Sequence, residues 1–154
     1  MRQVGIFGKR KSGKSALLHA LRKTDMMGGT NFSAMEIAGV GKIMLVDTVG
    51  VDAPDSTAER SAASIEVALM LIADESFELE LAWLSKLRKL GKKIFVVISQ
   101  ADKFSDGGKS LAAAVSEVSG LETVCVSAKT GTGIEELHSK IIGELSKIKM
   151  PLQS

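Results

Sequence analysis

Short, mostly apolar runs alternate with helix-like patterns along the whole chain. The runs have the length of buried strands and lie at Val4–Phe7, Met35–Ile37, Ile43–Val46, Val67–Ala73, Ile94–Ile98 and Thr123–Val126. The segments 14–21, 77–90, 111–118 and 134–148 carry apolar residues at helical spacing, and Ser56 with Glu59 matches a helix capping box. Strands that are apolar on both faces and alternate with helices form a parallel sheet covered on both sides. The sequence therefore predicts a three-layer α/β domain whose mostly parallel sheet has about six strands.

The size of the chain fits one such domain. Its 154 residues, 45% of them apolar, can bury a core without a disulfide or a structural metal. No internal repeat and no long linker divides the sequence. We expect one domain over residues 1–150 and a short tail over 151–154, because Pro151 lies beyond the last helical pattern.

Composition argues against several classes of protein. A single cysteine, Cys125, cannot form an internal disulfide or a cysteine-rich metal site, and its place in an apolar strand suggests a core residue. The longest apolar run, Val67–Ala73, is far shorter than the roughly 20 residues that a membrane helix needs. A net charge of +2 does not favour nucleic acid as a ligand. Because no signal-peptide pattern precedes the first strand, we expect a cytoplasmic domain without membrane contact.

The segment after the first strand carries the most specific motif of the chain. It reads Gly8-Lys9-Arg10-Lys11-Ser12-Gly13-Lys14-Ser15-Ala16. It matches the phosphate-loop pattern G-x-x-x-x-G-K-[ST] between a predicted strand and a predicted helix, so residues 8–16 are predicted to bind nucleotide phosphates. Lys14 would reach the β- and γ-phosphates, and the Ser15 hydroxyl would ligate Mg²⁺. For Lys9 and Arg10 we favour the alternative of a solvated basic turn.

A carboxylate and a glycine follow at the end of a later strand. Asp47 ends the apolar run Ile43–Val46, and Gly50 comes three residues after it. In phosphate-loop proteins a carboxylate in this place holds the Mg²⁺ shell, and the glycine N–H senses the γ-phosphate. Thr30, in the polar loop before this strand, is the candidate threonine that contacts both Mg²⁺ and the γ-phosphate. An ordinary turn threonine is the alternative.

Two further strands end in loops that suit recognition of a guanine base. The first loop reads Ser99-Gln100-Ala101-Asp102, and the second reads Ser127-Ala128-Lys129. The Asp102 carboxylate can accept hydrogen bonds from N1 and N2 of guanine, and adenine lacks both donors. The backbone of the second loop can donate to guanine O6. The alternative is an exposed loop aspartate beside a solvated helix-entry serine.

Charged residues gather at both ends of the predicted helix 77–90. The acidic group at its start comprises Asp74, Glu75, Glu78 and Glu80. These side chains are expected to offset the helix dipole rather than to hold a metal. The basic group at its end comprises Lys86, Arg88, Lys89, Lys92 and Lys93. It is expected to be a solvated helix end, with a patch for nucleic acid or an acidic partner as the alternative.

In this order the motifs resemble those of small GTPase domains of the translation-factor-related class, over residues 3–148. The resemblance implies a P-loop NTPase (small G-protein) fold, with GTP or GDP and Mg²⁺ as ligands. Within the class, the segments 5–15, 34–37 and 47–50 are most similar to the GTPase domain of the iron-only hydrogenase maturation factor HydF. That similarity implies a slow, nucleotide-controlled switch that a protein effector or dimer partner reads.

The chain departs from the family pattern at several positions. Lys11 replaces an asparagine that ligates an activating K⁺ in the K⁺-dependent members. Its ammonium would therefore substitute for K⁺ or remove activation by the cation. Ser99 and Gln100 replace the first two residues of the base-reading motif N-K-x-D, which predicts weaker guanine selectivity. Val51, after Gly50, cannot orient the attacking water as a glutamine does in Ras-type proteins, so unaided hydrolysis is expected to be slow.

Three functions fit these residues. The first is a Mg²⁺-dependent GTPase that cycles slowly between its GTP and GDP forms. The second is a degenerate scaffold that binds nucleotide without useful hydrolysis, which the changes at Lys11, Val51 and Ser99-Gln100 favour. The third is a P-loop kinase acting on a small substrate. The loop Ser127-Ala128-Lys129 and the lack of an obvious lid segment count against that third function.

Overall fold

The structure is a computed structural model, and it describes residues 2–9, 12–24, 34–37, 41–47 and 65–147. Its strands are β1 (Arg2–Phe7), β2 (Ala34–Ile37), β3 (Gly41–Asp47), β4 (Val67–Ile72), β5 (Lys93–Ile98) and β6 (Thr123–Cys125). Its helices are α1 (Lys14–Thr24), α3 (Glu78–Lys89), α4 (Lys109–Ser119) and α5 (Ile134–Lys147), with a short 3₁₀ helix η2 at Ala101–Lys103. The helix start predicted at Ser56 lies outside the described residues.

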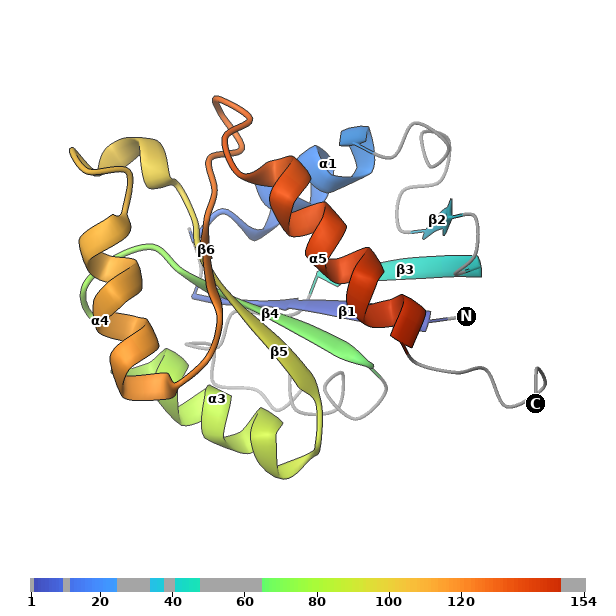
Figure 1. Cartoon of the computed structure of the whole chain (residues 1–154), viewed down its shortest axis with the longest axis horizontal. Coiled ribbons are helices and arrows are strands. Elements are labelled where there is room, and N and C mark those ends of the chain that lie inside the picture. Colours follow the sequence, from blue (N-terminus) through green and yellow to red (C-terminus); the bar gives the residue numbers. More distant parts are fainter. Residues whose placement is uncertain (1, 10–11, 25–33, 38–40, 48–64, 148–154) are drawn as a thin grey trace.

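The strands form one six-stranded sheet in the order β2-β3-β1-β4-β5-β6 (Figure 1). Every neighbouring pair is parallel except β2 with β3. The register places Ile6 of β1 opposite Asp47 of β3 on one side and opposite Leu69 of β4 on the other. The predicted α/β class and the mostly parallel six-stranded sheet are thus confirmed.

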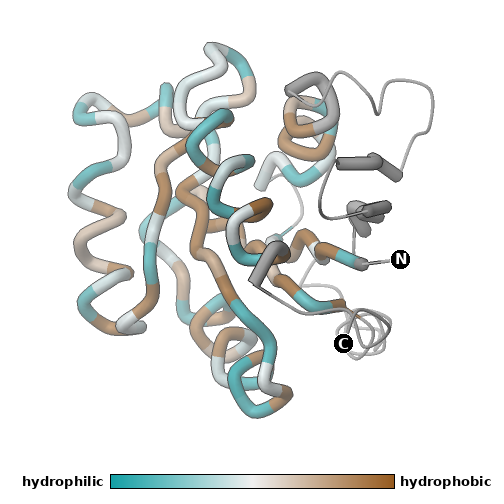
Figure 2. The backbone as a smooth tube through the Cα atoms, turned by 45° about the vertical axis from the view of Figure 1, so that its right-hand side comes forward, coloured by the Kyte–Doolittle hydropathy of each residue, from teal (hydrophilic) through white to brown (hydrophobic). Residues whose placement is uncertain are grey.

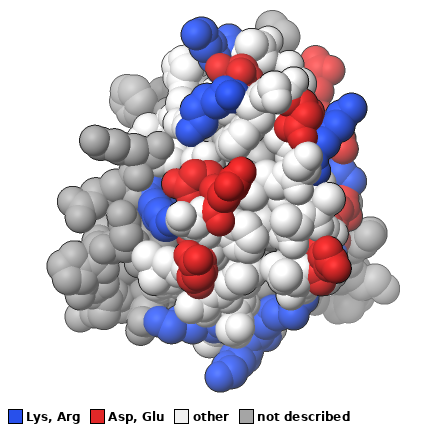
Figure 3. Space-filling model, turned by 90° about the vertical axis from the view of Figure 1, so that its left-hand side faces the viewer, with Lys and Arg blue, Asp and Glu red and all other residues white. Residues whose placement is uncertain are grey.

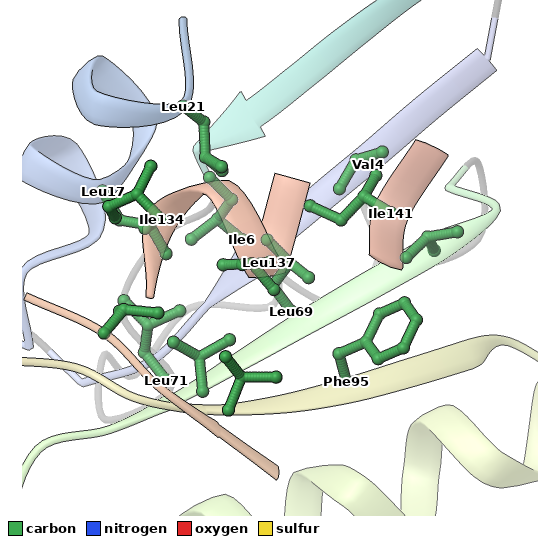
Figure 4. Close-up of a cluster of buried hydrophobic side chains, with 14 of the residues drawn as sticks. Val4, Ile6, Leu17, Leu21, Leu69, Leu71, Phe95, Ile134, Leu137 and Ile141 are labelled. Atoms are coloured by element: carbon green, nitrogen blue, oxygen red, sulfur yellow. The ribbon is translucent and has the colours of Figure 1, made fainter. Parts of the chain in front are cut away.

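Alternate residues of the central strand β4 face two separate cores, because successive side chains of a strand point to opposite faces. Leu69 and Leu71 join α1 and α5 in one buried cluster, in which Leu17, Leu137 and Phe95 also lie (Figure 4). The other face of the sheet is covered by α3 and α4. Its buried cluster contains Ala68, Met70, Ile72, Trp83, Leu87, Leu111 and Val115. Figure 2 shows the resulting layers, with apolar strands between helices of mixed polarity.

Each helix follows the spacing of its apolar residues. In α5 the buried residues Ile134, Leu137, Ile141 and Leu145 recur at intervals of three and four, so that one stripe faces the sheet. The helix α3 is followed by Gly91 and α4 by Gly120, both with positive φ (74° and 69°), as expected of glycines that terminate helices. None of the helices that the structure describes is long and apolar enough to cross a membrane.

Candidate nucleotide-binding site

The candidate site lies at the carboxyl edge of the sheet. Since β1, β3, β4, β5 and β6 are parallel, the loops that follow them leave the sheet on the same side. The crevice at this edge is where open α/β sheets bind ligands. The topology therefore brings together the phosphate loop after β1 and the two predicted base-reading loops after β5 and β6.

The side chain of Lys14 contacts the backbone of the described part of the phosphate loop. The Lys14 ammonium donates hydrogen bonds to the carbonyls of Gly8 (3.1 Å) and Lys9 (3.0 Å). The Ser12 N–H also donates to the Lys9 carbonyl (3.1 Å), and Gly13 adopts a φ of 94° before α1 begins. The first-turn N–H groups of α1, which include those of Ser15 and Ala16, belong to the helix end that favours an anion. This geometry suits a phosphate group.

Ser99 attaches the β5 loop to the phosphate loop. Its Oγ donates a buried hydrogen bond to the Ser12 carbonyl at 2.6 Å. A short hydroxyl side chain at this position therefore makes a direct contact with the loop that is predicted to hold phosphates. By contrast, Ser12 Oγ is buried and has no hydrogen-bond partner among the described residues.

Asp102 and Ser127 join the two base-reading loops. The buried Ser127 hydroxyl donates to Asp102 Oδ1 at 2.7 Å. This hydrogen bond is the main cause that lowers the pKa of Asp102, and the positive charges of Lys129 and Lys103 add to it. The exposed carboxylate is therefore ionised at neutral pH and can only accept hydrogen bonds. Such a group suits a ligand edge that presents two N–H donors.

A pocket of about 350 Å³ connects the two ends of the site. Among the residues that line it are Gly13, Ala16, Gln100, Asp102, Ala128 and Lys129. The pocket thus unites five of the predicted nucleotide-binding residues from three separate loops. Gln100 was not predicted to bind nucleotide; it was expected only as a departure from the family's base-reading motif. Gln100 adopts a left-handed conformation (φ 55°) and lies against Gly13, at the join between the phosphate loop and the base loop.

Lys9 does not face this pocket. Its ammonium lies 3.5 Å from Glu80 Oε1 and 3.8 Å from Asp74 Oδ1, and it donates to the Ser76 carbonyl. The prediction of a solvated basic turn is therefore wrong for Lys9. Glu80 was expected to be a dipole-offsetting acid, yet it is buried under the loop. Its spacing could have revealed this, because Glu80 shares the helix face of the buried Leu84 and Leu87.

The basic group at the end of α3 was expected to be a solvated helix end, and most of its members are exposed. Figure 3 shows charged side chains of both signs on this side of the molecule, with basic side chains gathered at its lower end. Lys86, Arg88 and Lys89 are exposed residues of the last turn of α3. The Lys86 ammonium lies 4.7 Å from the centre of the Trp83 ring, and Arg88 donates to the Ser119 carbonyl.

Several predicted site residues lie outside the described residues, namely Arg10, Lys11, Thr30 and Gly50. Asp47 is the last residue of β3, and Ser15 is the second residue of α1. Their carboxylate and hydroxyl oxygens are the donor type that Mg²⁺ prefers, so these two residues fit a magnesium ion by their chemistry. Within the described residues, no group of three or more His, Cys, Asp or Glu side chains is placed to hold a metal.

Comparison with known proteins gives curated relatives among translation initiation factors. IF-2 of Chlorobium phaeovibrioides (strain DSM 265 / 1930) is 28% identical over 92% of this chain and 18% of the factor. IF-2 of Novosphingobium aromaticivorans is 30% identical over 95% of this chain and 19% of the factor. The chain therefore spans about a fifth of the length of these relatives.

Solved structures agree with the fold. Elongation factor SelB from Methanococcus maripaludis, in its apo form, matches with a TM-score of 0.75 and 26% identity, over 96% of this chain and 35% of that one. The FeoB G-domain from Methanococcus jannaschii matches with a TM-score of 0.67 and 21% identity, over 96% of this chain and all of that domain, and it supports the fold alone. These matches do not reach the finer similarity to HydF, which stays a prediction.

A family model completes the comparison. The model described as "50S ribosome-binding GTPase" matches residues 3–100, a range that contains all of β1 except Arg2, the phosphate loop, α1, β2 to β5 and α3. Together with the phosphate-loop geometry and the P-loop fold, this match means that the chain belongs to that GTPase family and is a GTP-binding domain of the P-loop class.

Proposed function

We propose that the chain is a Mg²⁺-dependent GTPase that hydrolyses GTP slowly and acts as a nucleotide-controlled switch. One observation above all supports this: a single pocket holds Gly13 and Ala16 of the phosphate loop at one end and the Ser127-bound carboxylate of Asp102 at the other. A phosphate site and an acceptor for guanine N1 and N2 in the same pocket suit a guanine nucleotide.

The phosphate end would bind by charge and by backbone donors. The Lys14 ammonium, held by two loop carbonyls, would contact the β- and γ-phosphates. Ser15 and Asp47 would hold Mg²⁺, which neutralises charge on the phosphate oxygens when it is bound. Thr30 and the Gly50 N–H would sense the γ-phosphate in this proposal, and Lys9, Arg10 and Lys11 would contribute their backbone N–H groups.

The base end would discriminate by unpaired polar groups. The ionised Asp102 would accept from guanine N1 and N2, whereas adenine would offer this carboxylate no donor from the base. The loop Ser127-Ala128-Lys129 would donate to guanine O6. Gln100 would contact the nucleotide between its base and its phosphates, because the Gln100 side chain lies against Gly13 of the phosphate loop.

The test compares GDP with ADP in competition for the site, in the presence of Mg²⁺. GDP is expected to bind more tightly, and Lys14→Ala is expected to abolish the binding of both. If ADP binds as well as GDP, the assignment of Asp102 is wrong. Single-turnover cleavage of GTP is expected to take minutes or longer, because the side chain of Val51 cannot orient water.

A scaffold that binds nucleotide without useful hydrolysis is the second candidate, favoured by Val51 and by Lys11. Phosphate release above the level of Lys14→Ala would support the GTPase, and release equal to that variant would support the scaffold. Turnover in K⁺ and Na⁺ buffers is expected to be equal, since Lys11 replaces the K⁺ ligand. Strong stimulation by K⁺ would contradict this expectation.

A role with an effector or dimer partner in metalloenzyme maturation rests on the HydF resemblance alone.

A further inference from the structure

The phosphate loop has a second attachment, to α3, that binding of phosphates and base does not use. The Lys9 side chain leaves the loop away from the pocket and reaches Glu80, Asp74 and the Ser76 carbonyl. Glu80 is 1% exposed, whereas the Asp74 side chain is 61% exposed. Water screens an exposed ion pair and weakens it, so Glu80 is the partner that fixes Lys9.

The carboxylate of Glu80 depends on this lysine. Burial raises the pKa of Glu80, while a backbone hydrogen bond and the charge of Lys9 oppose that rise. Glu80 Oε1 has no hydrogen bond within the part of the chain that the structure describes, so the Lys9 ammonium at 3.5 Å is its compensating charge. Removing either partner of a buried pair leaves the other charge uncompensated, which is strongly unfavourable.

The backbone of the same lysine holds the phosphate-binding group. The Lys9 carbonyl accepts from the Lys14 ammonium at 3.0 Å and from the Ser12 N–H at 3.1 Å. One residue therefore links the buried carboxylate of α3, through its side chain, to the Lys14 ammonium, through its carbonyl. A change in the position of Lys9 would move the acceptor that orients Lys14.

We propose that Glu80 is a positioning residue of the phosphate loop, which fixes Lys9 and thereby orients Lys14 toward the β-phosphate of the nucleotide. The proposal rests on the proposed function, namely that the site binds a guanosine diphosphate or triphosphate. Its consequence is selective: Glu80 contributes to the recognition of a β-phosphate and contributes nothing to the recognition of the base or the α-phosphate.

The test measures the affinities for GDP and for GMP by calorimetry, with Mg²⁺ present, in wild type, Glu80→Gln, Lys9→Met and the double variant. GMP lacks the β-phosphate that Lys14 contacts. Each single variant is expected to weaken GDP binding by about tenfold and to leave GMP binding within about twofold. A misplacement of about 1 Å can cost about a hundredfold, and a smaller displacement of Lys14 should cost less. The double variant should lose no more than a single one, because both changes break the same link.

Two further variants accompany these. Glu78→Gln changes the same charge at an exposed position of the same turn of α3 and should bind GDP like wild type. Lys9→Arg keeps a cation for Glu80 and should lose less GDP affinity than Lys9→Met. Equal GDP affinity in wild type, Glu80→Gln and Lys9→Met would overturn the positioning role, as would equal losses for GDP and GMP. In both cases the proposed function would stand if wild type binds GDP and Lys14→Ala does not. Wild type that fails to bind GDP would overturn both proposals.

Discussion

Single hydroxyl groups hold the two recognition loops of the site in place. Ser99 Oγ reaches the Ser12 carbonyl, and Ser127 Oγ reaches the Asp102 carboxylate. Both serines are buried, so their hydroxyl groups are shielded from bulk water, whereas the Asp102 carboxylate itself is exposed. The position of the base loop relative to the phosphate loop therefore depends on a few short side chains, each of which donates a single hydrogen bond.

Asp102 is the residue whose change should alter the choice of base. In Asp102→Asn the two hydrogen bonds to guanine would lose the charged acceptor, and the new amide would place donors opposite the guanine donors. A hydrogen bond to a charged group contributes about 1.5–3 kcal/mol. Because the amide keeps one acceptor oxygen, the loss should be that of about one such bond, so GDP affinity should fall by about tenfold to a hundredfold. ADP affinity should change little. Titrating both nucleotides against the variant checks this.

Asp106→Asn is the matched control for this substitution. Asp106 accepts from the N–H groups of Gly108 and Ser110 at the start of α4 and does not line the pocket, so its change should lower stability without altering the preference for GDP. A parallel loss of GDP and ADP affinity in Asp102→Asn would contradict the role in base selection.

Ser12 offers a prediction of the opposite sign. Ser12 is 3% exposed, and its Oγ lacks a hydrogen-bond partner among the described residues. A buried hydroxyl without a partner costs about 1–3 kcal/mol, so Ser12→Ala should raise the free energy of unfolding by about 1 kcal/mol. Urea unfolding of the nucleotide-free protein measures this change. A decrease of similar size would mean that the hydroxyl has a partner beyond the described residues.

At the scale of the elements, the turn that leads into α5 requires a glycine. Gly133 has a φ of 75°, and a Cβ at this position would lie 2.1 Å from the Cys125 carbonyl oxygen. Gly133→Ala combines backbone strain with overlap against the end of β6, and it should lower the free energy of unfolding by about 3 kcal/mol or more. Denaturant unfolding checks this value.

Gly131 in the same turn is the matched control. It also has a positive φ, 86°, but a Cβ there would meet nothing within 4 Å. Gly131→Ala should therefore cost only the strain of a left-handed alanine, about 1–2 kcal/mol. Equal losses in the two variants would show that the contact with the Cys125 carbonyl does not matter.

The elements that the sequence predicted best are those with a regular pattern of burial. The spacing of Ile134, Leu137, Ile141 and Leu145 was enough to predict α5, and the apolar run after Glu66 was enough for β4. The antiparallel direction of β2 and the left-handed backbone of Gln100 could not be predicted, because both depend on contacts with distant segments. The ion pair of Glu80 with Lys9 also depends on such a contact, although the helical spacing of Glu80 could have indicated its burial.

At the scale of the whole molecule, the candidate site joins parts of the chain that are far apart in sequence. Gly13 and Ala16 belong to the loop and helix that follow β1, while Asp102 and Ala128 follow β5 and β6 on the other side of β4. A nucleotide in the pocket would contact both parts at once, because its base and its phosphates belong to one molecule. Ser99 and Gln100 join the same two parts within the protein: Ser99 bonds to the Ser12 carbonyl, and the Gln100 side chain lies against Gly13.

This arrangement predicts that an intact nucleotide stabilises the fold more than its separate pieces do. A ligand that binds only the folded state adds about 2.7 kcal/mol at a free concentration of 100 Kd. Mg²⁺-GDP should therefore raise the urea midpoint, whereas guanosine and pyrophosphate together, at the same concentrations, should raise it far less because each piece loses its own freedom of motion on binding. Lys14→Ala should remove the effect of GDP. An equal shift from the separate pieces would mean that the phosphate loop and the base loops do not act as one site.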